Sequence, residues 1–299
     1  MNAEDKKLYQ ASLKHPDVEE PIDLWFYRPW GFRLALMGRK FHWTPNQITV
    51  ASIFLGIGCG LLCYPTDWKL NLLGIVLLVL ADICDSADGQ LARLTRQYSP
   101  LGRILDGAAG DIWFITIYFA IFFRLFPEWG WWGLLLGALA GLSHRQQAAL
   151  ADYYRQIHLF MVKAATASSQ TMCELSEAGQ EKQKLQSLSF AHQPVETVFQ
   201  WFYVTYTQFQ EGRTPRWQAL RQHLPEVLTP AFAERFRQQS RPLMPIANAL
   251  TFNCRAITLF LALMLGMPWL YWVMEITVFN ALYLYMNRKH EQICSEALR

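Results

Sequence analysis

Residues 82–111 read DICDSADGQLARLTRQYSPLGRILDGAAGD and contain five aspartates, namely Asp82, Asp85, Asp88, Asp106 and Asp111. Long apolar runs flank this stretch, LNLLGIVLLVLA before it and IWFITIYFAIFF after it. Carboxylates on strongly apolar helices are costly in free energy and are usually retained for function. This stretch therefore decides the fold class and indicates where the chemistry is expected.

Two antiparallel helices are expected within this stretch. On a helix, Asp85 and Asp88 share one face, because side chains three positions apart are neighbours. The sequence SPLG then reverses the chain, and a second helix brings Asp106 back towards the first. Carboxylate oxygens on two facing helices form a hard site that suits Mg²⁺ or Mn²⁺ bound to phosphates. The alternative is that these aspartates form salt bridges with nearby arginines.

Hydropathy indicates an all-α integral membrane protein. The 299 residues are 52% hydrophobic, and they divide into long apolar runs and a polar middle. We expect six transmembrane helices, because each apolar run is long enough to cross a bilayer. They lie near residues 47–64, 70–93, 101–126, 132–163, 246–265 and 269–286, and the second half of the fourth is polar enough to leave the membrane.

Four segments follow from this pattern. Residues 1–43 form an N-terminal cytosolic or interfacial segment, whose charged first 20 residues are expected to be loosely ordered. Residues 44–163 hold spans one to four with the aspartates, 164–243 a cytosolic helical insertion, and 244–299 the last two spans and the tail. Residues 21–42 mix aromatic and basic side chains, which is typical of an amphipathic helix in the membrane interface. A helix that faces solvent is the alternative.

Basic residues indicate the orientation in the membrane. The predicted external turns contain only Lys69, whereas Arg93, Arg96 and Arg103 lie on the opposite side with the insertion. Loops rich in Lys and Arg usually remain cytosolic. We therefore expect both termini and the aspartates at the cytosolic face. Because the basic residues flank the spans, we expect them to contact lipid headgroups, and we expect no nucleic-acid partner.

The aspartates also belong to a longer pattern. The spacing Asp85-x2-Asp88-Gly89-x2-Ala92-Arg93-x8-Gly102-x3-Asp106 resembles the signature of the CDP-alcohol phosphotransferases. These integral membrane enzymes displace CMP from a CDP-linked alcohol with a second alcohol and so make phospholipids. The resemblance is sharpest over about residues 44–111. It implies a homodimer and a centre of two divalent ions, Mg²⁺ or Mn²⁺, held by Asp85, Asp88 and Asp106.

The resemblance assigns roles to the residues around these aspartates. It implies that the nucleotide and its phosphates contact Asn46, Gly89, Ala92, Arg93 and Gly102. An arginine suits this task, because its guanidinium can donate two parallel hydrogen bonds to a phosphate. For Asn46 a plain helix start is the alternative, because Thr44 and Pro45 are residue types favoured where helices begin.

One position departs from the family pattern. That pattern ends in a further Asp four residues after Asp106, commonly assigned as metal ligand and general base. Here the position is Gly110, and Asp111 follows, rotated by about 100° on a regular helix. A π-bulge could re-aim Asp111, which is our first candidate for the base and the fourth metal ligand. Otherwise Asp82 supplies the carboxylate from the first helix, or the site is degraded.

Polar residues on the fourth and fifth spans are candidates for binding the acceptor alcohol. They are His144, Arg145, Asn253 and Arg255. An ordinary interfacial position is the alternative for His144. For Arg255 the alternative is that its guanidinium snorkels to the headgroups, because a charge inside a span is costly unless it is paired or reaches water.

The expected function is a phospholipid-synthesising transfer of a substituted phosphate group from a CDP-alcohol to a second alcohol, with release of CMP. CDP-diacylglycerol with a polar acceptor, such as inositol or inositol phosphate, is favoured. The first alternative is an aminoalcohol phosphotransferase acting on a lipid alcohol such as diacylglycerol or a ceramide-like lipid. The second is an inactive relative that binds nucleotide or lipid. A cation transporter would explain the aspartates but not Gly89-x2-Ala92-Arg93.

Overall fold

The structure, a computed structural model, is helical throughout the part of the chain that it describes. That part covers residues 3–98, 100–166, 177–190 and 192–298, and it contains no β-strand. The predicted all-α class is therefore confirmed. Residues 167–176 of the predicted insertion lie outside the described residues.

Contacts divide the chain into two units. Unit 1 comprises Met1–His144 and Asn253–Ile276, and unit 2 comprises Arg145–Phe252 and Thr277–Arg299. This division follows packing, whereas the four predicted segments follow membrane topology. The predicted segment boundaries therefore stay a prediction.

Four helical stretches within the described residues are long and apolar enough to cross a membrane. They are Pro45–Cys63, Trp68–Thr95, Leu105–Trp129 and Pro230–Met264. The first three overlap the first three predicted spans, and the last overlaps the predicted fifth span. The predicted fourth and sixth spans are not among these four, so the six-span arrangement stays a prediction.

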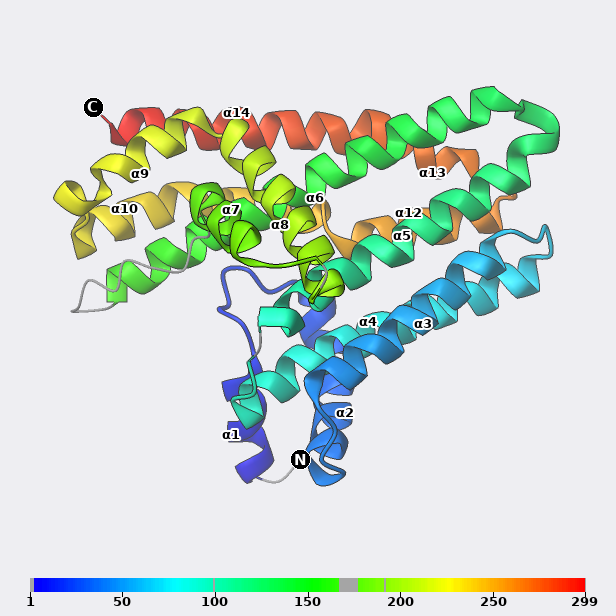
Figure 1. The fold of residues 1–299 in the computed structure, drawn as a ribbon, viewed down its shortest axis with the longest axis horizontal. Coiled ribbons are helices and arrows are strands. Elements are labelled where there is room, and N and C mark those ends of the chain that lie inside the picture. Colours follow the sequence, from blue (N-terminus) through cyan, green and yellow to red (C-terminus); the bar gives the residue numbers. More distant parts are fainter. Residues whose placement is uncertain (1–2, 99, 167–176, 191, 299) are drawn as a thin grey trace. The chain divides into compact units, whose positions relative to one another are not determined.

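Unit 1 is built around three long antiparallel helices. They are α3 (Pro45–Cys63), α4 (Trp68–Thr95) and α5 (Pro100–Trp129), and Figure 1 shows α3 and α4 running beside each other. Helices α1 (Ala3–Ser12) and α2 (Arg28–Lys40), with a π-turn at Asp23–Tyr27, pack on α4. Unit 1 also contains the start of α6 (Trp131–Thr166), as far as His144. It is completed by α12 (Phe252–Met264), α13 (Trp269–Met274) and the start of a π-turn at Glu275–Phe279.

The N-terminal residues correct one expectation. Residues 1–20 were expected to be loosely ordered, because they are charged. In the structure Ala3–Ser12 is a helix that contacts α4, and Ser12 and Val18 are buried. The composition of a short segment does not reveal the surface against which it packs.

The start of α3 is specified locally, as the sequence predicts. The Thr44 hydroxyl accepts a hydrogen bond from the backbone N–H of Gln47 at 3.3 Å, and the Gln47 side chain accepts from the Thr44 N–H at 2.9 Å. This reciprocal capping box, with Pro45 in the first turn, satisfies N–H groups that have no partner within the helix.

Two glycines allow α3 and α5 to approach closely. A Cβ atom at Gly56 would overlap the Trp113 ring, and one at Gly60 would lie 2.5 Å from Cγ2 of Thr116. Small residues four positions apart are the usual means by which membrane helices pack tightly. This contact fixes α5, which carries Asp106, against α3.

Gly56→Ala is expected to lower the thermal midpoint of the protein in detergent. The added methyl group would overlap the buried Trp113 ring, and such overpacking typically costs about 1–3 kcal/mol. Gly141→Ala is the matched control, because its Cβ would meet only Tyr118 at 3.9 Å. Circular dichroism on both variants checks this. A midpoint raised equally in both would show that α3 and α5 do not pack this closely.

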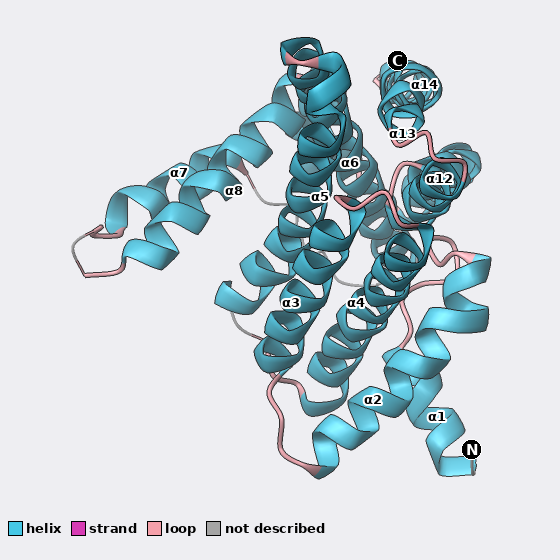
Figure 2. Ribbon diagram, turned by 90° about the vertical axis from the view of Figure 1, so that its right-hand side faces the viewer, coloured by secondary structure: helices cyan, strands magenta, loops and turns pink. Residues whose placement is uncertain are grey.

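Unit 2 is a second helical assembly. It contains α6 from Arg145 onwards, with α7 (Ala178–Ser187), α8 (Pro194–Gly212), α9 (Pro215–Val227), α10 (Pro230–Ser240), α11 (Met244–Ala249) and α14 (Asn280–Ala297). Figure 2 shows α7 and α8 as a hairpin. Trp217, fully buried, donates its indole N–H to the Tyr153 hydroxyl at 3.1 Å. The described part of the predicted insertion is thus helical, and its cytosolic position stays a prediction.

Candidate metal centre on α4 and α5

Three of the five aspartates come together where α4 faces α5. One carboxylate oxygen from each of Asp85, Asp88 and Asp106 lies within 4.8 Å of the others. Asp88 is buried, Asp85 is partly buried and Asp106 is exposed. The three carboxylates whose spacing in the sequence predicted a shared site thus lie in one group.

The third helix of unit 1 holds Asp88 in place. The Thr49 hydroxyl donates to Oδ2 of Asp88 at 2.6 Å and also lies 3.1 Å from the Pro45 carbonyl. The apolar side chains Ile48, Ala87 and Leu91, which are close to Thr49 and Asp88 in the sequence, belong to a buried cluster. The carboxylate is therefore oriented by α3 and supported by a packed core.

Two of these carboxylates, those of Asp85 and Asp88, have no salt-bridge partner within the described residues. Lys14 and Arg28 attract Asp85 only at longer range. Arg28 instead pairs with Glu19 at 3.1 Å, and Arg93 donates to the Ser12 carbonyl at 2.6 Å. Neighbouring carboxylates repel one another unless a cation lies between them. Their hard oxygen ligands fit Mg²⁺ or Mn²⁺.

The guanidinium of Arg93 lies over Gly89. A Cβ atom at Gly89 would be 3.5 Å from Nη1 and 3.6 Å from Nη2 of Arg93. In the described part of the chain Nη2 is buried and has no hydrogen-bond partner. Arg93 therefore keeps a donor that can serve a phosphate oxygen. Ala92 and Gly102 are partly buried, and Asn46 lies in the first turn of α3, three residues before Thr49.

Two of the predicted acceptor residues meet in a buried ionic network. Glu275 accepts a hydrogen bond from Nε of Arg255 at 3.0 Å, and the same oxygen lies 3.3 Å from Nδ1 of His144. All three side chains are buried. Arg255 is thus paired and does not snorkel. The sequence alone does not single out Glu275, because a single acid in an apolar run does not reveal its partner.

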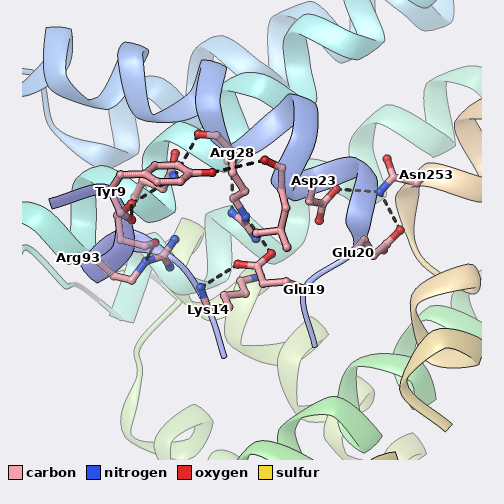
Figure 3. Close-up of polar contacts among 12 residues, drawn as sticks. Tyr9, Lys14, Glu19, Glu20, Asp23, Arg28, Arg93 and Asn253 are labelled. Atoms are coloured by element: carbon pink, nitrogen blue, oxygen red, sulfur yellow. Dashed lines mark hydrogen bonds and ion pairs between the residues drawn. The ribbon is translucent and has the colours of Figure 1, made fainter. Parts of the chain in front are cut away.

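The other two acceptor candidates have different surroundings. Asn253 donates to Glu20 and to Asp23, both at 2.8 Å, and so contacts the N-terminal segment (Figure 3). Arg145 belongs to unit 2, where it lies 3.5 Å from the Thr205 hydroxyl. The acceptor-binding roles of all four candidates stay predictions.

A comparison with known families identifies the chain. The sequence model of the family described as CDP-alcohol phosphatidyltransferase matches residues 42–207, more than half of the chain. The chain belongs to this family. CDP-alcohol phosphatidyltransferases are membrane-bound transferases that generally depend on divalent metal ions, which agrees with the apolar helices and with the three grouped carboxylates.

Curated relatives match a shorter part of this chain than the family model does. Proteins named "Putative cardiolipin synthase" from Mycobacterium tuberculosis and from Mycobacterium bovis are each 36% identical over 90 residues. The aligned part is 27% of this chain and 42% of each relative. This chain thus covers less than half the length of either.

The structure does not remove the departure from the family pattern at Gly110. Helix α5 is a regular α-helix over its described length, so the π-bulge that would re-aim Asp111 is absent there. Asp111 is exposed and, like Asp82, lies outside the group of carboxylates within 4.8 Å. A Cβ atom at Gly110 would meet nothing within 4 Å, so that position has room for a side chain.

The N-terminal segment lies outside the family match but contacts the motif helix. Besides the bond from Arg93 to Ser12, the buried Gln90 amide lies 3.3 Å from the Ser12 hydroxyl, and Arg28 donates to Ser86 at 3.2 Å. Burial, and then the carboxylates Asp82, Asp23 and Glu20, raise the pKa of the Tyr27 hydroxyl, which therefore stays protonated. No motif in the sequence indicates these contacts.

Thr49→Val is expected to weaken metal-dependent activity about 10- to 100-fold, the usual effect of losing a group that orients a metal ligand. Valine has nearly the same shape as threonine but cannot donate to Asp88. Metal titration of the activity checks this, and a higher metal requirement is expected. Thr116→Val, which removes a hydroxyl that donates to the Ile112 carbonyl at 2.8 Å, is the control.

Proposed function

We propose that this chain transfers a substituted phosphate group from a CDP-alcohol to a second alcohol and releases CMP. The observation that carries this proposal is the meeting of Asp85, Asp88 and Asp106 on two facing helices in a member of this family. These carboxylates offer the oxygen ligands needed to hold two divalent ions beside a pyrophosphate.

The side chains have distinct tasks in this reaction. When bound, the divalent ions would polarise the phosphorus and offset the charge that develops on CMP. Asp85, Asp88 and Asp106 hold them, with Asp88 oriented by Thr49. Arg93 donates to a phosphate oxygen of the donor.

Bond making and breaking then involve the acceptor hydroxyl and the phosphate carried by the alcohol. The acceptor oxygen forms a bond to this phosphorus, the bond from the phosphorus to the CMP oxygen breaks, and the hydroxyl proton passes to a base. Asp111 is the first candidate for this base, because it lies one residue from the family position, and Asp82 is the second. A carboxylate acting in this way needs to lie within about 3 Å of the hydroxyl, or to act through one water.

We favour CDP-diacylglycerol as donor and a polar alcohol, such as inositol or inositol phosphate, as acceptor. The relatives from Mycobacterium are named for the synthesis of cardiolipin, itself a phospholipid, which supports a lipid product. In this proposal the chain has six spans, cytosolic termini, an active site at the cytosolic face and a homodimeric assembly.

The first experiment measures CMP release by the purified protein in mixed micelles with Mn²⁺. CDP-diacylglycerol and CDP-ethanolamine are offered separately, each with a pool of acceptors. Release with CDP-diacylglycerol, lost in Asp106→Asn, supports the favoured reaction. Release only with CDP-ethanolamine assigns the aminoalcohol reaction instead. Nucleotide binding without release from either donor overturns the transferase and leaves a binding protein.

A further inference from the structure

A second group of potential metal ligands lies in unit 2, on α14. Residues 290–294 read HEQIC, so His290 and Cys294 are four positions apart and share one helix face. The same spacing places two zinc-binding histidines on one face in the helical motif H-E-x-x-H. In this chain a cysteine occupies the place of the second histidine.

The distances suit a tetrahedral ion. Ligand atoms of His290, Glu291 and Cys294 all lie within 4.8 Å of one another. The sulfur of Cys294 is 3.6 Å from Nδ1 of His290. Typical zinc bonds of about 2.0–2.1 Å to nitrogen and 2.3 Å to sulfur separate two ligands by about 3.6 Å at a tetrahedral angle. The two side chains therefore already have the spacing of a chelating pair.

Packing holds the imidazole in this position. His290 and Cys294 are fully buried. The His290 ring stacks on Tyr154 at 3.9 Å between centroids, and Trp217 and Phe236 meet it edge-on at 6.4 and 6.0 Å. These three aromatic contacts limit the movement of the imidazole, whose Nδ1 lies 3.6 Å from the thiol sulfur.

Glu291 has one oxygen anchored and one unused. Oε2 accepts a hydrogen bond from the backbone N–H of Arg216, at the start of α9, at 2.9 Å. Oε1 is buried and has no hydrogen-bond partner within the described residues. A buried oxygen without a partner is costly, and a cation would compensate it. Anchoring of the second oxygen is typical of carboxylates that bind metals.

From these contacts we propose that His290, Glu291 and Cys294 form a binding site for a thiophilic divalent cation such as Zn²⁺. A thiolate and an imidazole favour Zn²⁺ over Mg²⁺, whereas the all-oxygen group of Asp85, Asp88 and Asp106 has the opposite preference. This site is therefore separate from the proposed catalytic centre in its chemistry, and it belongs to unit 2.

The test is a Co²⁺ titration of the intact purified protein with its thiols reduced. A thiolate bound to Co²⁺ gives a charge-transfer absorption band, and one equivalent per chain is expected to produce it. Cys294→Ser should abolish the band, and Glu291→Gln should weaken Co²⁺ binding by more than about tenfold. Cys59→Ser and Asp85→Asn, which alter another buried thiol and the aspartate group, should retain the band.

Thermal unfolding gives a second measurement. Zn²⁺ should raise the midpoint of the unmodified protein, because an ion that binds only the folded state stabilises it. It should not do so in Cys294→Ser, a variant close in shape to the original. The absence of a thiolate band in the unmodified protein, or a band that persists in Cys294→Ser, overturns the proposal and leaves an ordinary thiol–imidazole contact in the core.

Discussion

Asp88→Asn is expected to lower metal-dependent CMP release by about a hundredfold or more, comparable with the loss of a group that stabilises transition-state charge. The substitution removes one of three grouped carboxylates and preserves the shape of the side chain. Initial rates in mixed micelles at saturating Mn²⁺ measure the effect.

The thermal stability of the Asp88→Asn variant should not fall with its activity. Without metal its thermal midpoint should equal or exceed that of the unmodified protein, because one of three mutually repelling charges is gone. The stabilisation by added Mn²⁺ should shrink. A structural role for Asp88 would instead lower the midpoint whether or not metal is present.

Asp67→Asn is the matched control for Asp88→Asn. Asp67 precedes the same helix, α4, at its other end, where its side chain accepts a hydrogen bond from the Lys69 N–H at 2.8 Å. Asparagine caps helices about as well as aspartate. Full activity is expected from this control. Unchanged activity in Asp88→Asn would contradict the assigned metal centre.

Asp111→Asn is expected to lower kcat about 10²- to 10⁴-fold, the range attributed to a general base, while the KM for the CDP-alcohol changes little. The expectation rests on Asp111 being the base, since this residue lies one position from the family aspartate. Steady-state kinetics with varied donor and varied acceptor measure the two constants separately.

Gly110→Asp in the Asp111→Asn background should restore much of the lost activity. The family places its aspartate at this position, and a side chain there meets no atom within 4 Å of its Cβ. Asp82→Asn serves as the comparison. If Asp82→Asn loses activity and Asp111→Asn does not, the base is Asp82. Full activity in both variants would remove both aspartates from this role.

Local patterns predicted the elements that carry the site. The positions of α3, α4 and α5 follow from apolar runs and capping residues, which act within a few residues of sequence. The approach of Asp106 to Asp85 and Asp88 follows from helix periodicity and a short reversal. The π-bulge that could have re-aimed Asp111 is not found in α5, because neighbouring glycines permit such a distortion without requiring one.

Residues distant in sequence account for the features that were missed. Arg28 donates to Ser86 across 58 positions, Ser12 accepts from Arg93 across 81 positions, and Glu275 pairs with Arg255 across 20 positions. Each of these side chains is an ordinary polar residue when read in its own segment. Its role becomes visible only through the partner that folding brings beside it.

By itself, the sequence determined the helical membrane class, the family and the three carboxylates that meet, because these depend on hydropathy and on spacing along one helix or across one short turn. Only the tertiary structure decided that the N-terminal segment packs on the motif helix, that Arg255 is paired, and that Asp111 lies outside the carboxylate group. These features depend on the direction in which side chains point after distant helices pack, and no local pattern specifies that direction.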